Sequence, residues 1–180
     1  MRNFAVVAGA VMLLCVSLPT PGEAQWVWIG GGGSFPVSDY GDYAKTGVLL
    51  TGGVGVPVGE EGLSLFGEAF WGQNGHSDFD GDKTNPYGFM GGVQLDMATE
   101  DQGGPYFFGE AGILFHKYSS DTFDGDTSSG FGYGAGAGYS FPLGGVNGWI
   151  EGRAMNASID GSKTSFVSVL AGVSIPVSGS

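Results

Sequence analysis

The sequence predicts an all-β protein, an eight-stranded antiparallel up-and-down transmembrane β-barrel. Three observations predict it: a very high glycine content together with many aromatic residues, eight segments in which side chains alternate with period two, and a division of these segments into an uncharged face and a face that carries charge. The 180 residues allow a single domain.

The composition separates this chain from other glycine-rich proteins. Glycine accounts for 37 residues, against a usual share of about 7%. Aromatic residues make up 13% of the chain, which argues against a disordered glycine-rich linker because such linkers lack apolar groups to bury. Small membrane barrels combine glycine, which leaves interior space, with aromatic rings at the membrane interfaces.

The start of the chain predicts a secretory signal peptide over residues 1–24, followed by an outer-membrane barrel domain over residues 25–180. Arg2 supplies the positive start, residues 4–18 form an uncharged apolar run, and Gly22-Glu23-Ala24 offers small residues for cleavage. A retained membrane helix is the alternative, but the run is shorter than the about 20 apolar residues that span a bilayer.

Charge and cysteine usage exclude several functions. Without residues 1–24 the chain carries 5 basic and 17 acidic residues, which opposes nucleic-acid binding because that depends on clustered Lys and Arg. The only cysteine, Cys15, lies in the segment expected to be removed, so we expect neither disulfide nor thiolate chemistry. No cofactor is expected.

Eight segments alternate as half-buried strands do, and each is near or above the roughly 9–11 residues that a tilted strand needs to cross a bilayer. The connections after the second, fourth and sixth segments are tight, as periplasmic turns are, and the others are more polar, as outer loops are. Asp-Gly pairs, at residues 80–81, 124–125 and 160–161, favour tight turns in these outer loops. The predicted strands are residues 26–37, 47–58, 63–73, 87–98, 106–118, 130–141, 146–157 and 164–177.

The two faces of these segments differ in charge. One face is uncharged until Lys117 at the outer end of the fifth segment, and a Lys or Arg at the bilayer midplane would cost about 2–4 kcal/mol. This face is therefore predicted to contact lipid. The other face is predicted to line a filled interior and not an aqueous pore, because eight strands leave room only for side chains. It carries Glu68, Gln94, Asp96, Glu110, His116, Glu151 and Arg153, together with the rings of Trp26, Trp28, Phe66, Phe70, Phe108 and Trp149.

The sixth segment predicts where the internal charges meet. Its inward residues from Gly130 to Gly138 are all glycine, and strands two apart in a sheet are separated by about 10 Å. Side chains of the fifth and seventh segments can therefore meet across this bare wall, which predicts an internal charge network. Three carboxylates against one guanidinium imply that one acid is protonated, or that water or a cation shares the site. The network consists of Glu68, Glu110, Glu151 and Arg153.

The sequence resembles the small outer-membrane β-barrels of the OmpA/OmpX type over the whole of residues 25–180. The resemblance implies the outer membrane of a Gram-negative bacterium, a monomer, insertion by the barrel assembly machinery, contact with lipids and lipopolysaccharide, and an interior Glu–Arg network. The chain ends in Ile175-Pro-Val-Ser-Gly-Ser180, where those proteins usually end on an aromatic residue. The features that carry the resemblance are residues 30–36, 105–110, 134–138, 151–153 and 170–175.

Two clusters of aspartates and the two histidines also have functional interpretations. Clustered carboxylates suit hard cations, although a solvated acidic hairpin tip is the simpler interpretation. His116 could serve as a catalytic base, as in barrels that deacylate lipid A, but it faces the interior and no His-x-Ser-Asn element is present. His76 is expected to be solvated in a loop. The carboxylate clusters are Asp78, Asp80 and Asp82, and Asp121, Asp124 and Asp126.

The sequence therefore favours a non-enzymatic integral barrel with a structural or surface-interaction role, such as envelope integrity or adhesion. A narrow channel for small solutes or ions is the first alternative, for which the internal network would act as a gate. A lipid A-modifying enzyme is the second, and a soluble β-barrel is the rival at the level of the fold.

Overall fold

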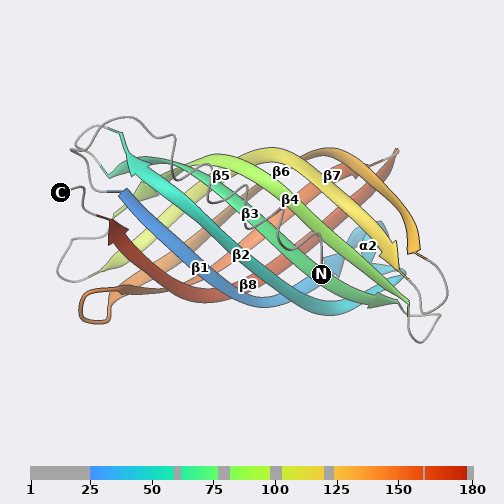
Figure 1. The fold of residues 1–180 in the computed structure, drawn as a ribbon, viewed down its shortest axis with the longest axis horizontal. Coiled ribbons are helices and arrows are strands. Elements are labelled where there is room, and N and C mark those ends of the chain that lie inside the picture. Colours follow the sequence, from blue (N-terminus) through green and yellow to red (C-terminus); the bar gives the residue numbers. More distant parts are fainter. Residues whose placement is uncertain are drawn as a thin grey trace.

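The computed structural model describes residues 25–58, 62–76, 82–97, 103–119, 124–159 and 161–177. Consecutive strands pair antiparallel, and β1 also pairs with β8, so the sheet closes into a barrel (Figure 1). The predicted fold class is confirmed. The elements are β1 (Gln25–Val37), α2 (Ser38–Gly41), β2 (Ala44–Pro57), β3 (Leu63–His76), β4 (Lys83–Asp96), β5 (Gly104–Ser119), β6 (Asp124–Pro142), β7 (Asn147–Ile159) and β8 (Ser162–Val177).

The strands reach further at one end of the barrel than the sequence pattern indicates. β6 begins at Asp124 instead of residue 130, and Asp124 pairs with Ser119 of β5. The turn predicted at Asp124-Gly125 is therefore wrong, since both residues belong to the strand. Residues 124–129 carry no apolar side chain, so the alternation stops there while the backbone hydrogen bonding continues. The alternation of apolar side chains therefore marks only the part of a strand that faces lipid, and the backbone pairing of the strand extends beyond that part.

The opposite end of the barrel carries the start of β1, the end of β8 and the three connections that the sequence predicts as tight periplasmic turns. These connections are not shorter than those at the other end, because the strands extend further there than the alternation indicates. In the turn between β6 and β7, Gly144 and Gly145 have φ values of +72° and +87°, and Leu143 N–H donates to the carbonyl of Val146 at 2.9 Å. Two successive residues with positive φ are what a tight type I′ hairpin requires, and glycine adopts them without strain. We assign this end to the periplasm, as the sequence predicts, because the connections at the other end are the more polar ones.

The outward face of the barrel is an apolar surface, as the alternation predicts. Ile29, Leu50, Phe107 and Tyr133 are each about half exposed or more, although they are large and apolar. In the described ranges, the charged residues on this outward face stand only at the outer ends of their strands. They are Lys83, Lys117 and Lys163. Because charge is absent between the two ends, this surface is suited to lipid.

Inside the barrel, aromatic rings from odd-numbered strands lie over glycines of the neighbouring strands. Phe108 of β5 is the register partner of Gly136 of β6, and a Cβ placed on Gly136 would lie 2.5 Å from Phe108 Cζ. The same relation holds for six further register pairs, and rings of β5 thereby cover Gly136 and Gly138 of the wall that the sequence predicts to be bare on β6. These pairs are Trp26–Gly55, Trp28–Gly53, Phe66–Gly92, Phe70–Gly88, Tyr106–Gly138 and Trp149–Gly172.

The outer half of the interior is closed by side chains that we call the outer plug. Tyr40 of α2 is fully buried, and its hydroxyl donates to Asn74 Oδ1 at 3.4 Å. Burial raises the pKa of the Tyr40 phenol, so it stays protonated and keeps its donor at neutral pH. The sequence did not predict α2, because a single helical turn is too short for periodicity to reveal it. Besides Tyr40 and Asn74, the plug contains Ser34, Leu49, Leu114, Met155, Phe166, Ser168 and Leu170.

No helix in the described ranges is long and apolar enough to cross a membrane.

The ring-over-glycine packing predicts opposite results for two glycine substitutions. Gly136→Val forces a branched side chain against Phe108, and we expect it to lower the free energy of unfolding by about 1–3 kcal/mol, the usual cost of overpacking. Gly152→Val is the matched control, because a Cβ there meets no atom within 4 Å and faces outward. Thermal unfolding of both variants in detergent, followed by circular dichroism, measures the difference. Equal stability of the two variants would contradict the packing.

Candidate functional site: the ion cluster inside the barrel

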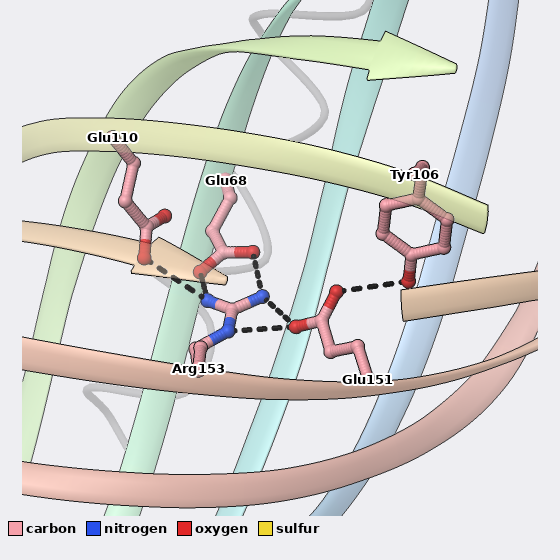
Figure 2. Close-up of polar contacts among 5 residues, drawn as sticks. All are labelled: Glu68, Tyr106, Glu110, Glu151 and Arg153. Atoms are coloured by element: carbon pink, nitrogen blue, oxygen red, sulfur yellow. Dashed lines mark hydrogen bonds and ion pairs between the residues drawn. The ribbon is translucent and has the colours of Figure 1, made fainter. Parts of the chain in front are cut away.

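Four charged side chains from three strands meet inside the barrel, and we call them the ion cluster. Glu68 lies on β3, Glu110 on β5, and Glu151 and Arg153 on β7 (Figure 2). Each is between 4% and 7% exposed. The structure thus brings together the four residues that the sequence placed in an internal network.

Arg153 is the centre of the cluster. Its Nη1 contacts Glu68 Oε1, and its Nη2 lies 3.1 Å from Glu68 Oε2, so the two residues form a bidentate pair. On its own strand, Nε donates to Glu151 Oε1 at 2.7 Å, and Nη2 lies 2.5 Å from the same oxygen. Nη1 also lies 3.4 Å from Glu110 Oε1. Four of these contacts are hydrogen bonds and the fifth, between Nη2 and Glu151, is an ion-pair contact, so each nitrogen of the guanidinium is held by a carboxylate.

The strand arrangement explains how these residues reach one another. In an eight-stranded barrel, β3 and β7 stand on opposite walls, so the pair between Arg153 and Glu68 crosses the interior. Glu110 reaches Arg153 from β5 across β6, where Gly134 and Gly136 are the register partners of Glu110 and Arg153. A Cβ on Gly134 would lie 2.9 Å from Glu110 Oε1. Glycine on β6 is therefore what leaves room for Glu110.

Two aromatic residues of β5 support the cluster, and the sequence did not single out this role. The Tyr106 hydroxyl donates to Glu151 Oε2 at 3.0 Å, which fixes the carboxylate oxygen that Arg153 does not use. The guanidinium carbon of Arg153 lies 5.1 Å from the centre of the Phe108 ring, within cation–π range. Tyr106 and Phe108 alternate with Glu110 along β5, so their side chains point inward as that of Glu110 does. This alternation is the sequence signal that could have identified them.

The three carboxylates do not contribute equally. Glu68 and Glu151 each make two contacts with Arg153, whereas Glu110 makes one contact at 3.4 Å. Glu110 Oε2 has no hydrogen-bond partner among the described residues. Within the same ranges no group of three or more His, Cys, Asp or Glu is arranged to hold a metal ion. The cluster is therefore a cross-wall tie made by one guanidinium and two carboxylates, with a third carboxylate at its edge.

The predicted loop sites lie largely outside the described residues. Asp78, Asp80 and Asp121 fall in segments 77–81 and 120–123, and Asp124 and Asp126 are described only as backbone of β6. Asp82 accepts a hydrogen bond from the Tyr118 hydroxyl. The cation-binding interpretation of these aspartates stays a prediction, and so does cleavage after residue 24.

Neither histidine is arranged for catalysis in the described part of the chain. The His116 ring packs 5.4 Å from the Tyr40 ring inside the outer plug, and its Nε2 has no hydrogen-bond partner there. The prediction that His76 is solvated in a loop is wrong. His76 ends β3, its Nε2 lies 2.7 Å from Thr84 Oγ1, and its ring contacts Tyr118, because β3 and β4 continue to pair beyond the apolar span.

The fold can be compared with solved structures. Neisserial surface protein A superposes with a TM-score of 0.69 at 13% identity, over 88% of this chain and 100% of that protein. The attachment invasion locus protein Ail of Yersinia pestis gives a TM-score of 0.57 at 16% identity, over 85% of this chain and 99% of Ail. Ail in complex with the heparin analogue sucrose octasulfate gives 0.52 at 16% identity, over 86% of this chain and 100% of Ail. No family model and no curated protein matches this sequence.

The chain has the fold of the small eight-stranded outer-membrane β-barrels. The resemblance to barrels of the OmpA/OmpX type is thereby confirmed for the fold. Together with the uncharged outward face, this fold is that of a protein of the Gram-negative outer membrane, as the sequence predicts.

The unequal contacts predict unequal effects of the same chemical change. Glu68→Gln replaces one carboxylate oxygen of the bidentate pair by an NH₂ group that points a donor at Arg153, and we expect a loss of about 2 kcal/mol of stability. Glu110→Gln is the matched control, because it removes the same charge but disturbs only one long contact. We expect its cost to be below about 1 kcal/mol.

Urea unfolding of both variants in lipid vesicles measures this difference. An equal or larger loss in Glu110→Gln would show that the bidentate pair across the interior is not the main contact.

Proposed function

We propose that this protein is a non-enzymatic integral outer-membrane barrel with a structural or surface-interaction role, in envelope integrity or adhesion. The observation that supports it is the closed interior. Leu49, Leu114, Phe166 and Leu170 of the outer plug are at most 1% exposed, so side chains fill the outer half of the interior among the residues that the structure describes. The function then resides in the outward face and the outer loops.

The channel is the main competing function, and it is disfavoured by the outer plug. The ion cluster adds a second closure, because Arg153 ties opposite walls together through Glu68. Buried pairs of this kind more often satisfy charge and fix strand register than open and close a path. The enzyme is disfavoured because His116 packs within the plug and does not face lipid.

Conductance decides between the barrel and the channel. In planar bilayers we expect the purified protein to give no current steps above those of protein-free membranes. Leu114→Ala is the informative variant, because it removes a fully buried side chain of the plug and tests whether the plug is what blocks current. Steady conductance of the unaltered protein would contradict the proposed function.

The outer end of the barrel carries more negative than positive charge. The connections after β1, β3, β5 and β7, with the first residues of β6, contain nine aspartates, while the four lysines of the chain stand at the outer strand ends. We propose that this end contacts lipopolysaccharide phosphates through bridging divalent cations. Neisserial surface protein A and the attachment invasion locus protein Ail, which share this fold, support a surface role. The excess of aspartate disfavours the sulfated ligand seen with Ail.

We further propose that the protein acts as a monomer, that the barrel assembly machinery inserts it, and that residues 1–24 are removed. The closed sheet supports the first of these, because β1 pairs with β8 and leaves no open edge for a second chain.

Calcium tests the cation bridge. We expect calcium to raise the thermal unfolding midpoint of the protein in micelles that contain lipopolysaccharide. The shift should disappear when Asp78, Asp80 and Asp82 are all changed to Asn, and it should persist in Asp96→Asn, a change at the opposite end. A shift of equal size without lipopolysaccharide would place the cation within the loops alone and contradict bridging.

A further inference from the structure

The periplasmic half of the barrel contains a cavity, which we call the vestibule. Its volume is about 360 Å³, and its lining includes Gln25, Pro57 and Pro176 at strand ends, so it reaches the periplasmic rim. Glu68, Glu151 and Arg153 of the ion cluster also line it. The vestibule therefore extends from the rim to the middle of the barrel. Its volume falls in the range of about 300–1,000 Å³ that is typical of small-molecule sites.

Aromatic rings from all four odd-numbered strands form the wall of the vestibule. Adjacent rings are 5.9 to 6.5 Å apart between centroids, in an unbroken series from Trp26 through Trp28, Phe66 and Phe108 to Tyr106. Trp149 of β7 completes the lining. The ring-over-glycine pairs hold these side chains against the wall, since the glycines of the adjacent strands leave space only for a flat ring. The cavity lies between these rings.

The charges that line the vestibule are mostly negative. Glu68, Glu151 and Asp96 stand against the single cation Arg153. All three guanidinium nitrogens of Arg153 already contact carboxylates, so its positive charge is paired within the protein. Asp96, nearer the rim, accepts hydrogen bonds from Gln94 Nε2 at 3.0 Å and has no cation partner among the described contacts. An incoming molecule meets aromatic faces and carboxylate oxygens.

These surroundings select one chemical class. Faces of Trp, Tyr and Phe attract cations, most strongly at sites shielded from water, and carboxylates add a charge of the opposite sign. An anion would be repelled, and a neutral apolar molecule would desolvate the carboxylates without replacing their partners. The wall already holds one cation in this way, because the Arg153 guanidinium lies over the Phe108 ring.

We propose that the vestibule is a binding site for small organic ammonium ions that enter from the periplasm. The positive head group lies among the rings near Asp96 and Glu151, and its alkyl substituents contact the indoles of Trp28 and Trp149. This inference is independent of the proposed function, since it concerns the opposite end of the barrel from the outer loops.

Choline is a suitable probe, and its uncharged tert-butyl analogue, in which carbon replaces the quaternary nitrogen, is the matched ligand control. Trp26, Trp28 and Trp149 line the vestibule, while Trp71 has the outward parity, so tryptophan fluorescence reports mainly on this site. The folded protein is held in a maltoside detergent, because detergents with quaternary nitrogens would compete. Sodium chloride keeps the ionic strength constant.

We expect saturable quenching by choline and none by the tert-butyl analogue over the same range. Asp96→Asn should weaken choline binding by about tenfold, the effect of about 1.4 kcal/mol. Asp82→Asn, the same change at the outer end, should leave it unchanged. Equal binding of choline and the analogue, no saturable binding of choline, or equal affinities of Asp96→Asn and the unaltered protein would each overturn the proposal.

Discussion

The structure depends on the closure of the sheet in a medium that supplies no hydrogen-bond partners. Lipid hydrocarbon cannot satisfy backbone N–H and C=O groups, so the strands must satisfy one another without an open edge. The pairing of β1 with β8, from Gln25–Val177 to Val37–Ser165, closes the barrel. Closure with eight strands leaves a narrow interior that side chains must fill. The charged and aromatic residues inside are consequences of this limit.

The narrow interior is filled in two different ways. In the outer half, side chains such as Leu49, Leu114 and Phe166 pack to near-complete burial. In the periplasmic half, rings lie flat over glycines and leave the vestibule between them. The ion cluster lies between these two halves, where Arg153 crosses to Glu68 on the opposite wall. Among the described residues, the interior is thus filled toward the outer end and hollow toward the periplasmic rim.

Much of the fold and of the ion cluster could be predicted from the sequence, and most of the features that could not be predicted depend on strand register. Period-two alternation places the side chains of Glu68 and Arg153 inward and that of Phe107 outward, because successive side chains of a strand point to opposite faces of the sheet. Parity does not give register, so it could not show that Phe108 covers Gly136 or that Tyr106 binds Glu151. Parity therefore predicts a bare wall of glycines on β6, and only the register shows that Phe108 and Tyr106 cover two of them. The polar ends of β3 and β6 were also not predicted, because the alternation of apolar side chains stops where these strands leave the lipid.

The central claim is a closed barrel inserted in the outer membrane with its charges inside. Gel mobility of the protein from outer-membrane fractions, with and without boiling, tests it most directly. A closed barrel resists detergent until heated, so the account predicts that boiling shifts the band of a protein recovered in those fractions. An unshifted band from protein recovered in the soluble periplasmic fraction would contradict the account.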